Sequence, residues 1–294
     1  MWKNATTTCL AWLAGPVLLQ LGGADQLAVE QRPNHPPLVV YDFNLDLGPA
    51  GNMDYLDSLG FSGLVTRVDV PADLPKLSAY AQHVETVPGF DLLAYVSYDF
   101  DFPPSSQIWR LALPTLAQVG APLWVIVRGA PSSTALRELL EEMAIESQAA
   151  GVETVIYPHW GTDIESADEA AALIGDIGHP NLKSSLHTCH EIRIGNQYAL
   201  DTVAAQHAQA SSLVTIAGAE NGAYAGPFSV LVDWSDAILP LDQGDFSLLP
   251  FLQALHDADY DRPVVLHTFG ITDDPGHLER SLEEYAAYLE QIVR

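Results

Sequence analysis

The stretch Leu123-Trp124-Val125-Ile126-Val127 is continuously apolar and ends at Arg128. A strand with one buried face alternates apolar and polar residues, whereas a strand in a parallel sheet covered on both faces forms one apolar run. The run Val264-Val265-Leu266 repeats this pattern near the end of the chain. Both runs therefore predict strands of a parallel sheet with helices packed around it.

Short β-rich runs recur on both sides of this stretch and alternate with longer helical patterns, without a linker. The predicted strands are residues 38–43, 63–69, 91–98, 122–128, 152–157, 182–187, 212–217 and 263–267. This alternation predicts a (βα)8 TIM barrel, an α/β fold of about 250 residues, as a single domain over residues 38–294. A doubly wound open sheet is the alternative, but residues 43–48 lack the glycine-rich phosphate turn that its first strand requires.

Helix boundaries between these strands follow capping rules. A helix over residues 133–150 opens on a Ser/Thr cap and ends at Gly151, and one over 166–177 begins with the capping-box pattern Ser-Ala-Asp-Glu. The last helix, over 275–294, has apolar residues at spacings of three and four, so one face packs inward.

The chain has 294 residues, with 38 acidic against 12 basic side chains and a net charge of −26. Nucleic-acid binding depends on Lys and Arg contacts to phosphate, so nucleic acid is excluded as a partner. An anionic membrane surface is disfavoured for the same reason. The alternative interpretation of the charge is that it keeps the protein soluble.

The N-terminus has the pattern of a targeting segment. Lys3 precedes an apolar stretch at residues 10–21 and the small residues Gly22-Gly23-Ala24, which predicts a signal peptide at 1–24, an extension at 25–37 and an exported protein. The stretch is short for a membrane span, so an uncleaved anchor is the weaker interpretation, and a frayed helix is a third. Removal of Cys9 with the signal would leave Cys189 without an intrachain disulfide partner.

Histidines gather at the predicted strand ends, where active sites of this fold lie. The residues are His159 after the fifth strand, His187 and His190 at the sixth, and His267 at the eighth. Converging imidazoles suit a divalent transition metal such as Zn, Mn, Fe, Co or Ni. Each histidine alone is more simply a hydrogen-bonding residue at the rim.

Other polar and aromatic residues near the strand ends are candidates for catalysis or substrate binding. Glu220, Asp42, Asp99 and Asp101 are candidate bases, and Arg128 either orients the substrate or pairs with Asp99 or Asp101. Trp160, Tyr157 and Asp99 are candidate substrate-binding residues, although Trp160 could instead cover the barrel top. Cys189 is expected to be a packing residue rather than a nucleophile. The long segment 218–243 is either a functional rim loop or a surface decoration.

Several motifs resemble those of the xylose isomerase-like TIM-barrel superfamily, the clan of sugar phosphate isomerases and epimerases. Tyr157-Pro158-His159-Trp160-Gly161 is similar to its Glu-Asn-His segment, and Leu186-His187-Thr188-Cys189-His190 to its Leu-Asp-Thr-Gly-His strand. Residues 239–246 and 260–270 are similar to the turn before its seventh helix and to its last strand. The resemblance begins near the first strand and is strongest from Gly151 onward.

The resemblance implies a metal held by Glu, Asp, His and Glu, but the matching positions here hold Tyr157, His187, Thr215 and His267. All three carboxylates are replaced, so a glutamate-based proton shuttle does not carry over. The resemblance and the histidines together predict a sugar isomerase, epimerase or lyase that acts on a non-phosphorylated carbohydrate or polyol by metal-assisted proton transfer next to a carbonyl. The alternative is a non-catalytic carbohydrate-binding relative that has lost the metal site. The clan's endonuclease IV activity is disfavoured by the acidic composition.

Overall fold

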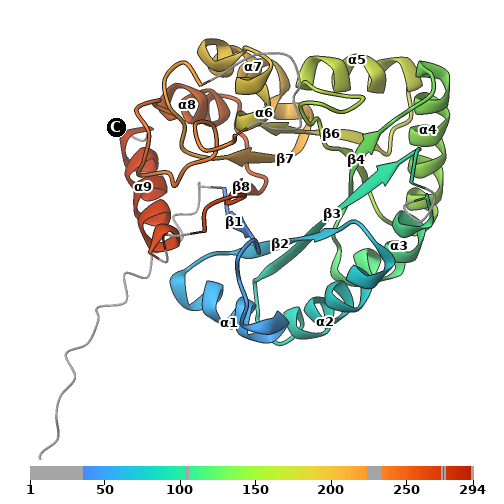
Figure 1. Cartoon of the computed structure of the whole chain (residues 1–294), viewed down its shortest axis with the longest axis horizontal. Helices are drawn as coiled ribbons and strands as arrows, with labels where there is room; N and C mark the ends of the chain where they lie inside the picture. The colour runs from blue at the N-terminus through green and yellow to red at the C-terminus, as the bar shows by residue number, and fades with distance from the viewer. Residues whose placement is uncertain (1–35, 103–105, 224–232, 273, 275, 293–294) are drawn as a thin grey trace, which may run out of the picture. The chain divides into compact units, whose positions relative to one another are not determined.

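A computed structural model describes residues 36–102, 106–223, 233–272, 274 and 276–292 of the chain. Within these residues the strands are all parallel and close into a barrel in sequence order, with β8 pairing back to β1. Helices lie around the outside of the barrel (Figure 1), so the predicted (βα)8 fold is confirmed. The strands are β1 (Leu38–Tyr41), β2 (Gly63–Val68), β3 (Asp91–Asp99), β4 (Leu123–Arg128), β5 (Thr154–Ile156), β6 (Leu182–His187), β7 (Ser211–Ile216) and β8 (Val264–Leu266).

The helices that follow the strands begin and end close to the predicted residues. Ser132 Oγ accepts a hydrogen bond from the Ala135 N–H at the start of α4, and Ser166 Oγ accepts one from the Glu169 N–H at the start of α5, each at 3.1 Å. Each cap satisfies one N–H that the first helical turn leaves free. The helices are α1 (Gly48–Leu59), α2 (Leu74–Val84), α3 (Ile108–Val119), α4 (Ser133–Ala149), α5 (Ala167–Ile177), α6 (Thr188–Arg193), α7 (Leu200–His207), α8 (Leu249–Asp257) and α9 (His277–Ile292).

Five buried rings fill the centre of the barrel. Trp124 stacks on Tyr157 with ring centroids 4.6 Å apart, and Tyr157 stacks on His187 at 3.9 Å. Tyr41 and Tyr95 pack edge-on at 5.8 Å and complete the group. We call Tyr41, Tyr95, Trp124, Tyr157 and His187 the aromatic floor, because their buried rings pack against one another inside the barrel.

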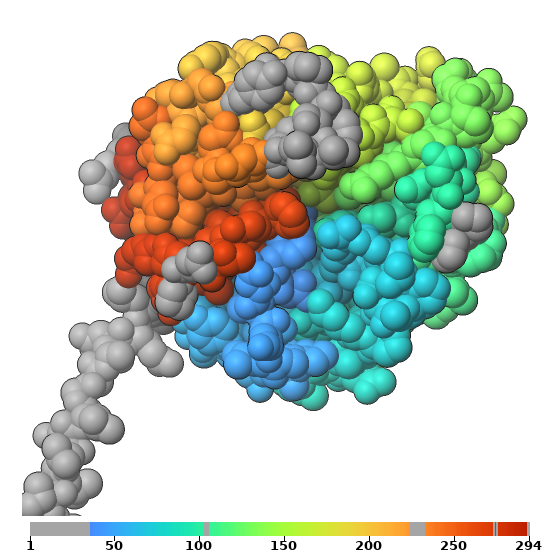
Figure 2. Space-filling model, viewed as in Figure 1, coloured from blue at the N-terminus to red at the C-terminus, as the bar shows by residue number. Residues whose placement is uncertain are grey.

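Strand register brings residues of distant sequence to one level of the barrel. Asp99 at the end of β3 is paired in register with Arg128 at the end of β4, and His187 on β6 with Thr215 on β7. The chain's colours follow one another around the same face of the molecule in the space-filling view (Figure 2). In the described part of the chain, no helix combines the length and the apolarity needed to cross a membrane. The predicted signal peptide at 1–24, and the predicted extension as far as residue 35, lie outside the described residues.

Candidate functional site

The histidine cluster consists of His159, His187, His190 and His267, at the carboxyl ends of β5, β6 and β8. The ring centroid of His190 lies 4.0 Å from that of His159, 5.5 Å from that of His187 and 6.4 Å from that of His267. His187 is the last residue of β6, and α6 starts at the next residue, so the short segment Thr188-Cys189-His190 turns directly over the strand end. The structure therefore brings the four rings together at the mouth of the barrel.

His187 uses both ring nitrogens in a hydroxyl network. Ser185 Oγ donates to the Ile156 carbonyl at 2.9 Å and lies 2.7 Å from His187 Nε2, so Nε2 carries the ring proton and donates it to Ser185. The Thr215 hydroxyl then donates to His187 Nδ1 at 2.7 Å. His187 was expected to bind metal, but its only lone pair is already used. In this arrangement it is a packing and hydrogen-bonding residue of the aromatic floor.

His190 differs from His187 in the hydrogen bonding of its ring. Its side chain is only 2% exposed, and neither ring nitrogen has a hydrogen-bond partner in the described part of the chain. A buried polar atom without a partner is costly, so such a ring is normally paired with a ligand, a metal ion or an ordered water. His159 is partly satisfied, because Nδ1 lies 2.8 Å from the Trp160 carbonyl and must donate to it. The Nε2 atom of neutral His159 is therefore an acceptor.

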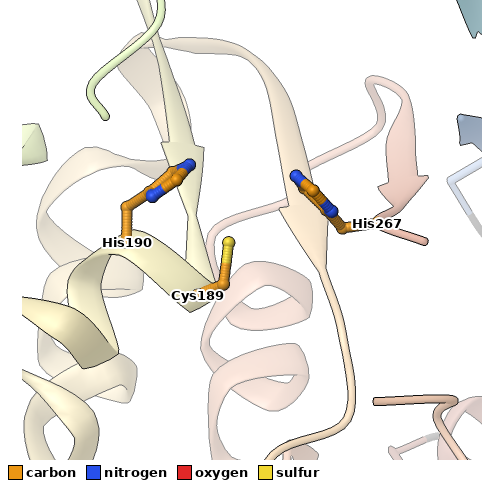
Figure 3. A group of neighbouring side chains, drawn as sticks. All are labelled: Cys189, His190 and His267. Carbon is orange, nitrogen blue, oxygen red and sulfur yellow. The ribbon is translucent and has the colours of Figure 1, made fainter. Parts of the chain in front are cut away.

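Cys189, His190 and His267 form a second grouping, which we call the Cys-His-His trio. One ligand atom from each residue lies within 4.8 Å of the others, and all three residues are buried. Figure 3 shows the Cys189 thiol between the two imidazole rings. His267 makes one long contact, from the Phe269 N–H to Nδ1 at 3.3 Å. Two imidazoles and a thiol are a donor set that suits Zn²⁺ and similar ions.

Burial keeps the thiol and the two imidazole rings of the trio in their neutral forms. It raises the pKa of the Cys189 thiol to about 12 and lowers the pKa of His267 to about 3. Burial, together with the neighbouring His159, holds the pKa of His190 well below its usual value. Both imidazoles are therefore unprotonated at neutral pH, which is the form that binds a metal or accepts a proton.

These depressed pKa values predict acid destabilisation of the metal-free protein. In chelator, the unfolded chain takes up protons on His190 and His267 below about pH 6.5, whereas the folded protein does not. The free energy of unfolding should therefore fall as the pH drops from 7 to 5, by up to about 1.4 kcal/mol per pH unit for each histidine. Urea unfolding of wild type and His267→Gln at several pH values tests this. The variant should show a shallower slope, and equal slopes would contradict the assignment.

The aromatic ring best placed to stack on a substrate is not one of those that the sequence predicts. Tyr157 is 3% exposed within the aromatic floor, and Trp160 is 4% exposed, so neither presents a free ring face to a sugar. Trp234, from the segment after β7, is half-buried, and its ring lies 5.3 Å from His190 and 5.8 Å from Trp160 between centroids. Trp234 is therefore the better placed aromatic for a substrate at the histidine cluster.

Arg193 anchors the segment that carries Trp234. This arginine is 1% exposed, donates to the Asp236 carboxylate and the Asp233 carbonyl, and lies 4.9 Å from the centroid of the Trp234 ring. An ion pair from a buried arginine, together with a cation–π contact, holds a loop in one geometry. The sequence segment 218–243 is thus tied to the site at this point, while residues 224–232 lie outside the described part.

The predicted carboxylate bases are engaged elsewhere or distant from the cluster. The buried Asp42 pairs with Lys76 at 2.7 Å and accepts hydrogen bonds from Thr66 and Tyr80. Glu220 is exposed, and no contact joins it to the histidine cluster among the described residues. Asp99 Oδ1 accepts the Asp101 N–H at 2.8 Å. Within the cluster itself, His159 Nε2 is an acceptor that sequence alone did not single out as a base.

Sequence alone did not assign two residues to the site. Cys189 is a buried packing residue against Ala217 and Ile238, as expected, and it also lies beside His190 and His267. Its position directly between His187 and His190 at a strand end was a usable signal. Trp234 had no such signal, because only the anchoring by Arg193 brings its segment to the mouth.

A protein-family model described as xylose isomerase-like TIM barrel matches residues 104–292. No curated protein sequence matches the chain. Among solved structures, L-ribulose 3-epimerase is 14% identical with a TM-score of 0.66, covering 88% of this chain and 96% of its own. The 3-keto-D-glucoside 4-epimerase YcjR from E. coli is 13% identical with a TM-score of 0.66, covering 86% of this chain and 100% of its own. The IOLI protein with a bound zinc atom is 15% identical with a TM-score of 0.62, covering 87% and 98%.

Proposed function

The chain belongs to the xylose isomerase-like TIM barrel family, and on that premise we propose that it is a sugar isomerase or epimerase acting on a non-phosphorylated carbohydrate or polyol. The reaction would move a proton on the carbon next to a carbonyl group, at the mouth of the barrel. Solved relatives of the same fold that are named as sugar epimerases support this class of reaction.

One observation carries the proposal: the buried, neutral His190 ring lies in the histidine cluster, and neither of its nitrogens has a hydrogen-bond partner among the described residues. A histidine that served only to pack the barrel would be satisfied as His187 is, by neighbouring hydroxyls. The unpartnered nitrogens therefore point to a ligand at this position. Their neighbours, His159 and His267, add two more neutral imidazoles to the same place.

A metal ion implied by the family fits the Cys-His-His trio better than the family's own ligand positions. Those positions hold Tyr157, His187, Thr215 and His267, and the first three are locked in stacking and hydroxyl contacts. The trio instead supplies a thiol, the His190 ring, whose nitrogens have no partner in the described part of the chain, and the weakly held His267. A divalent metal held there would polarise the substrate carbonyl and make the neighbouring C–H more acidic.

The chain's own residues would bind the sugar and move the proton. The half-buried Trp234 ring would stack on the apolar face of the sugar, held in place by Arg193. His159 Nε2 would accept the proton, because its Nδ1–H is committed to the Trp160 carbonyl. A single base on one face favours isomerisation, in which the same nitrogen returns the proton to the former carbonyl carbon. The hydroxyl proton of the neighbouring carbon moves to the former carbonyl oxygen in the same conversion.

A second candidate function is sugar binding without turnover, at a site that has lost its metal. The locked state of His187 and the absence of the family's carboxylate ligands favour it. The two functions share a binding site and differ only in whether chemistry follows.

A turnover assay separates the two functions. Untagged protein loaded with Zn²⁺, Mn²⁺ or Co²⁺ would be incubated with matched aldoses and ketoses, and the products resolved by NMR. The proposal expects a new isomer or epimer from at least one compound, at a rate that falls when the metal is removed by chelation. Saturable sugar binding with every compound recovered unchanged would support the binding protein instead.

A further inference from the structure

Arg128 stands at the end of β4 on the inward face of the barrel. Side chains of a strand alternate between its two faces, so Trp124, Ile126 and Arg128 share one face, and Trp124 belongs to the aromatic floor. Arg128 therefore lies above that floor on the side of the mouth. The pKa of His159 is lowered to about 4, mainly by burial and next by the positive charge of Arg128. Arg128 therefore lies near the histidine cluster.

Arg128 differs from the other arginines that the structure describes. Each of those donates to a carboxylate or a backbone carbonyl, whereas Arg128 has no such partner within the described residues. The partnered arginines are Arg67, Arg110, Arg137, Arg193, Arg262 and Arg280. In a chain with 38 acidic and only 12 basic side chains, a half-buried arginine without a carboxylate needs an explanation.

The carboxylates around Arg128 are directed elsewhere. Asp69 pairs with Arg67 and accepts the Ser97 hydroxyl at 2.5 Å, and Asp163 accepts the Ala130 N–H at 2.8 Å. Asp99 and Asp101 lie beside Gly129, the next residue along the chain, and among the described residues no ion pair joins either carboxylate to Arg128. Of the two roles that the sequence leaves open for Arg128, the described residues therefore favour substrate orientation, because no carboxylate among them pairs with the guanidinium.

We propose that Arg128 binds a carboxylate of the substrate, so that the protein acts on a sugar acid such as a uronate rather than on a neutral sugar. The inference rests on the proposed function for the placement of the sugar at the histidine cluster. The planar guanidinium fork matches a carboxylate in two parallel hydrogen bonds. A single unpaired arginine balances one negative charge, which favours a carboxylate over a doubly charged phosphate.

Matched sugar pairs test this inference. D-glucuronate and D-glucose, and D-galacturonate and D-galactose, differ only in a carboxylate at the last carbon, and each would be titrated calorimetrically into the metal-loaded full chain. We expect at least one acid to bind about tenfold or more tightly than its neutral partner, as for hydrogen bonds to charged groups. Arg128→Met should remove that preference, by lowering the affinity for the acid to about that for the neutral sugar. Arg137→Met, which breaks an exposed pair with Asp176, is the control and should change neither.

Each failure has its own signature. Equal affinity for acid and neutral sugar, or an unchanged preference in Arg128→Met, overturns the carboxylate site, and turnover of a neutral sugar would leave the proposed function standing. An Arg128-dependent preference without turnover of any compound upholds the carboxylate site and overturns the reaction. Tighter binding of glucose 6-phosphate than of glucuronate contradicts the choice of a carboxylate.

Discussion

Untagged protein is expected to bind one Co²⁺ per chain and to develop a near-ultraviolet charge-transfer band from a thiolate ligand. The Cys189 thiol lies with ligand nitrogens of His190 and His267 within 4.8 Å, so an ion held by this trio must displace the thiol proton. A site built from imidazoles alone would bind Co²⁺ without that band. The spectrum therefore reports which residues hold the metal, independently of any enzymatic activity.

The matched variant is Cys189→Ser, which keeps the shape of the side chain and removes the sulfur. We expect it to lose the band and to bind Co²⁺ more than about 100-fold more weakly, because even residues that only support metal ligands contribute 10–100-fold. His207→Gln, which removes a histidine paired with Asp168 outside the site, is the control. Stoichiometric Co²⁺ binding without a thiolate band, or an unchanged band in Cys189→Ser, would contradict the trio.

Replacing His159 by glutamine is expected to lower kcat on a converted sugar by about 10²- to 10⁴-fold, the usual contribution of a general base. Glutamine can still donate to the Trp160 carbonyl, as His159 Nδ1 does, but it cannot accept a proton. Sugar affinity and metal content should remain close to wild type. Steady-state kinetics with calorimetric binding measure both quantities.

The control for this variant is His83→Gln. His83 on α2 pairs with Asp54 on α1, away from the barrel mouth. A loss of activity in both variants would indicate a general effect of the substitution. Full activity of His159→Gln would remove His159 as the base and leave the proton transfer to another group.

The fold was predictable because its signal is local. The run Leu123-Trp124-Val125-Ile126-Val127 became β4, and the helices that Ser132 and Ser166 cap begin where those residues predicted. Strand ends were less well predicted: β5 spans only Thr154–Ile156, where an apolar pattern had suggested a longer strand. Sequence pattern identifies which residues are buried in a barrel, but hydrogen bonds between neighbouring strands fix where each strand ends.

The site was predicted less completely because its chemistry depends on contacts between strands. His187 was expected to bind metal, but Ser185 and Thr215, which come from β6 and the neighbouring β7, occupy both of its nitrogens. Tyr157 follows β5 at the predicted place, yet stacking on Trp124 makes it part of the core. Such partners are adjacent only after the barrel closes, so no spacing in the sequence reveals them.

Solvent deuterium exchange tests the central claim most directly. Metal-loaded wild-type protein would be incubated in D₂O with uronates and their neutral partners, in aldose and ketose forms, and deuterium at the carbon next to the carbonyl followed by NMR. The account predicts incorporation into at least one sugar that it binds, and its loss in His159→Gln. Saturable binding of these sugars with no deuterium incorporated into any of them would contradict it.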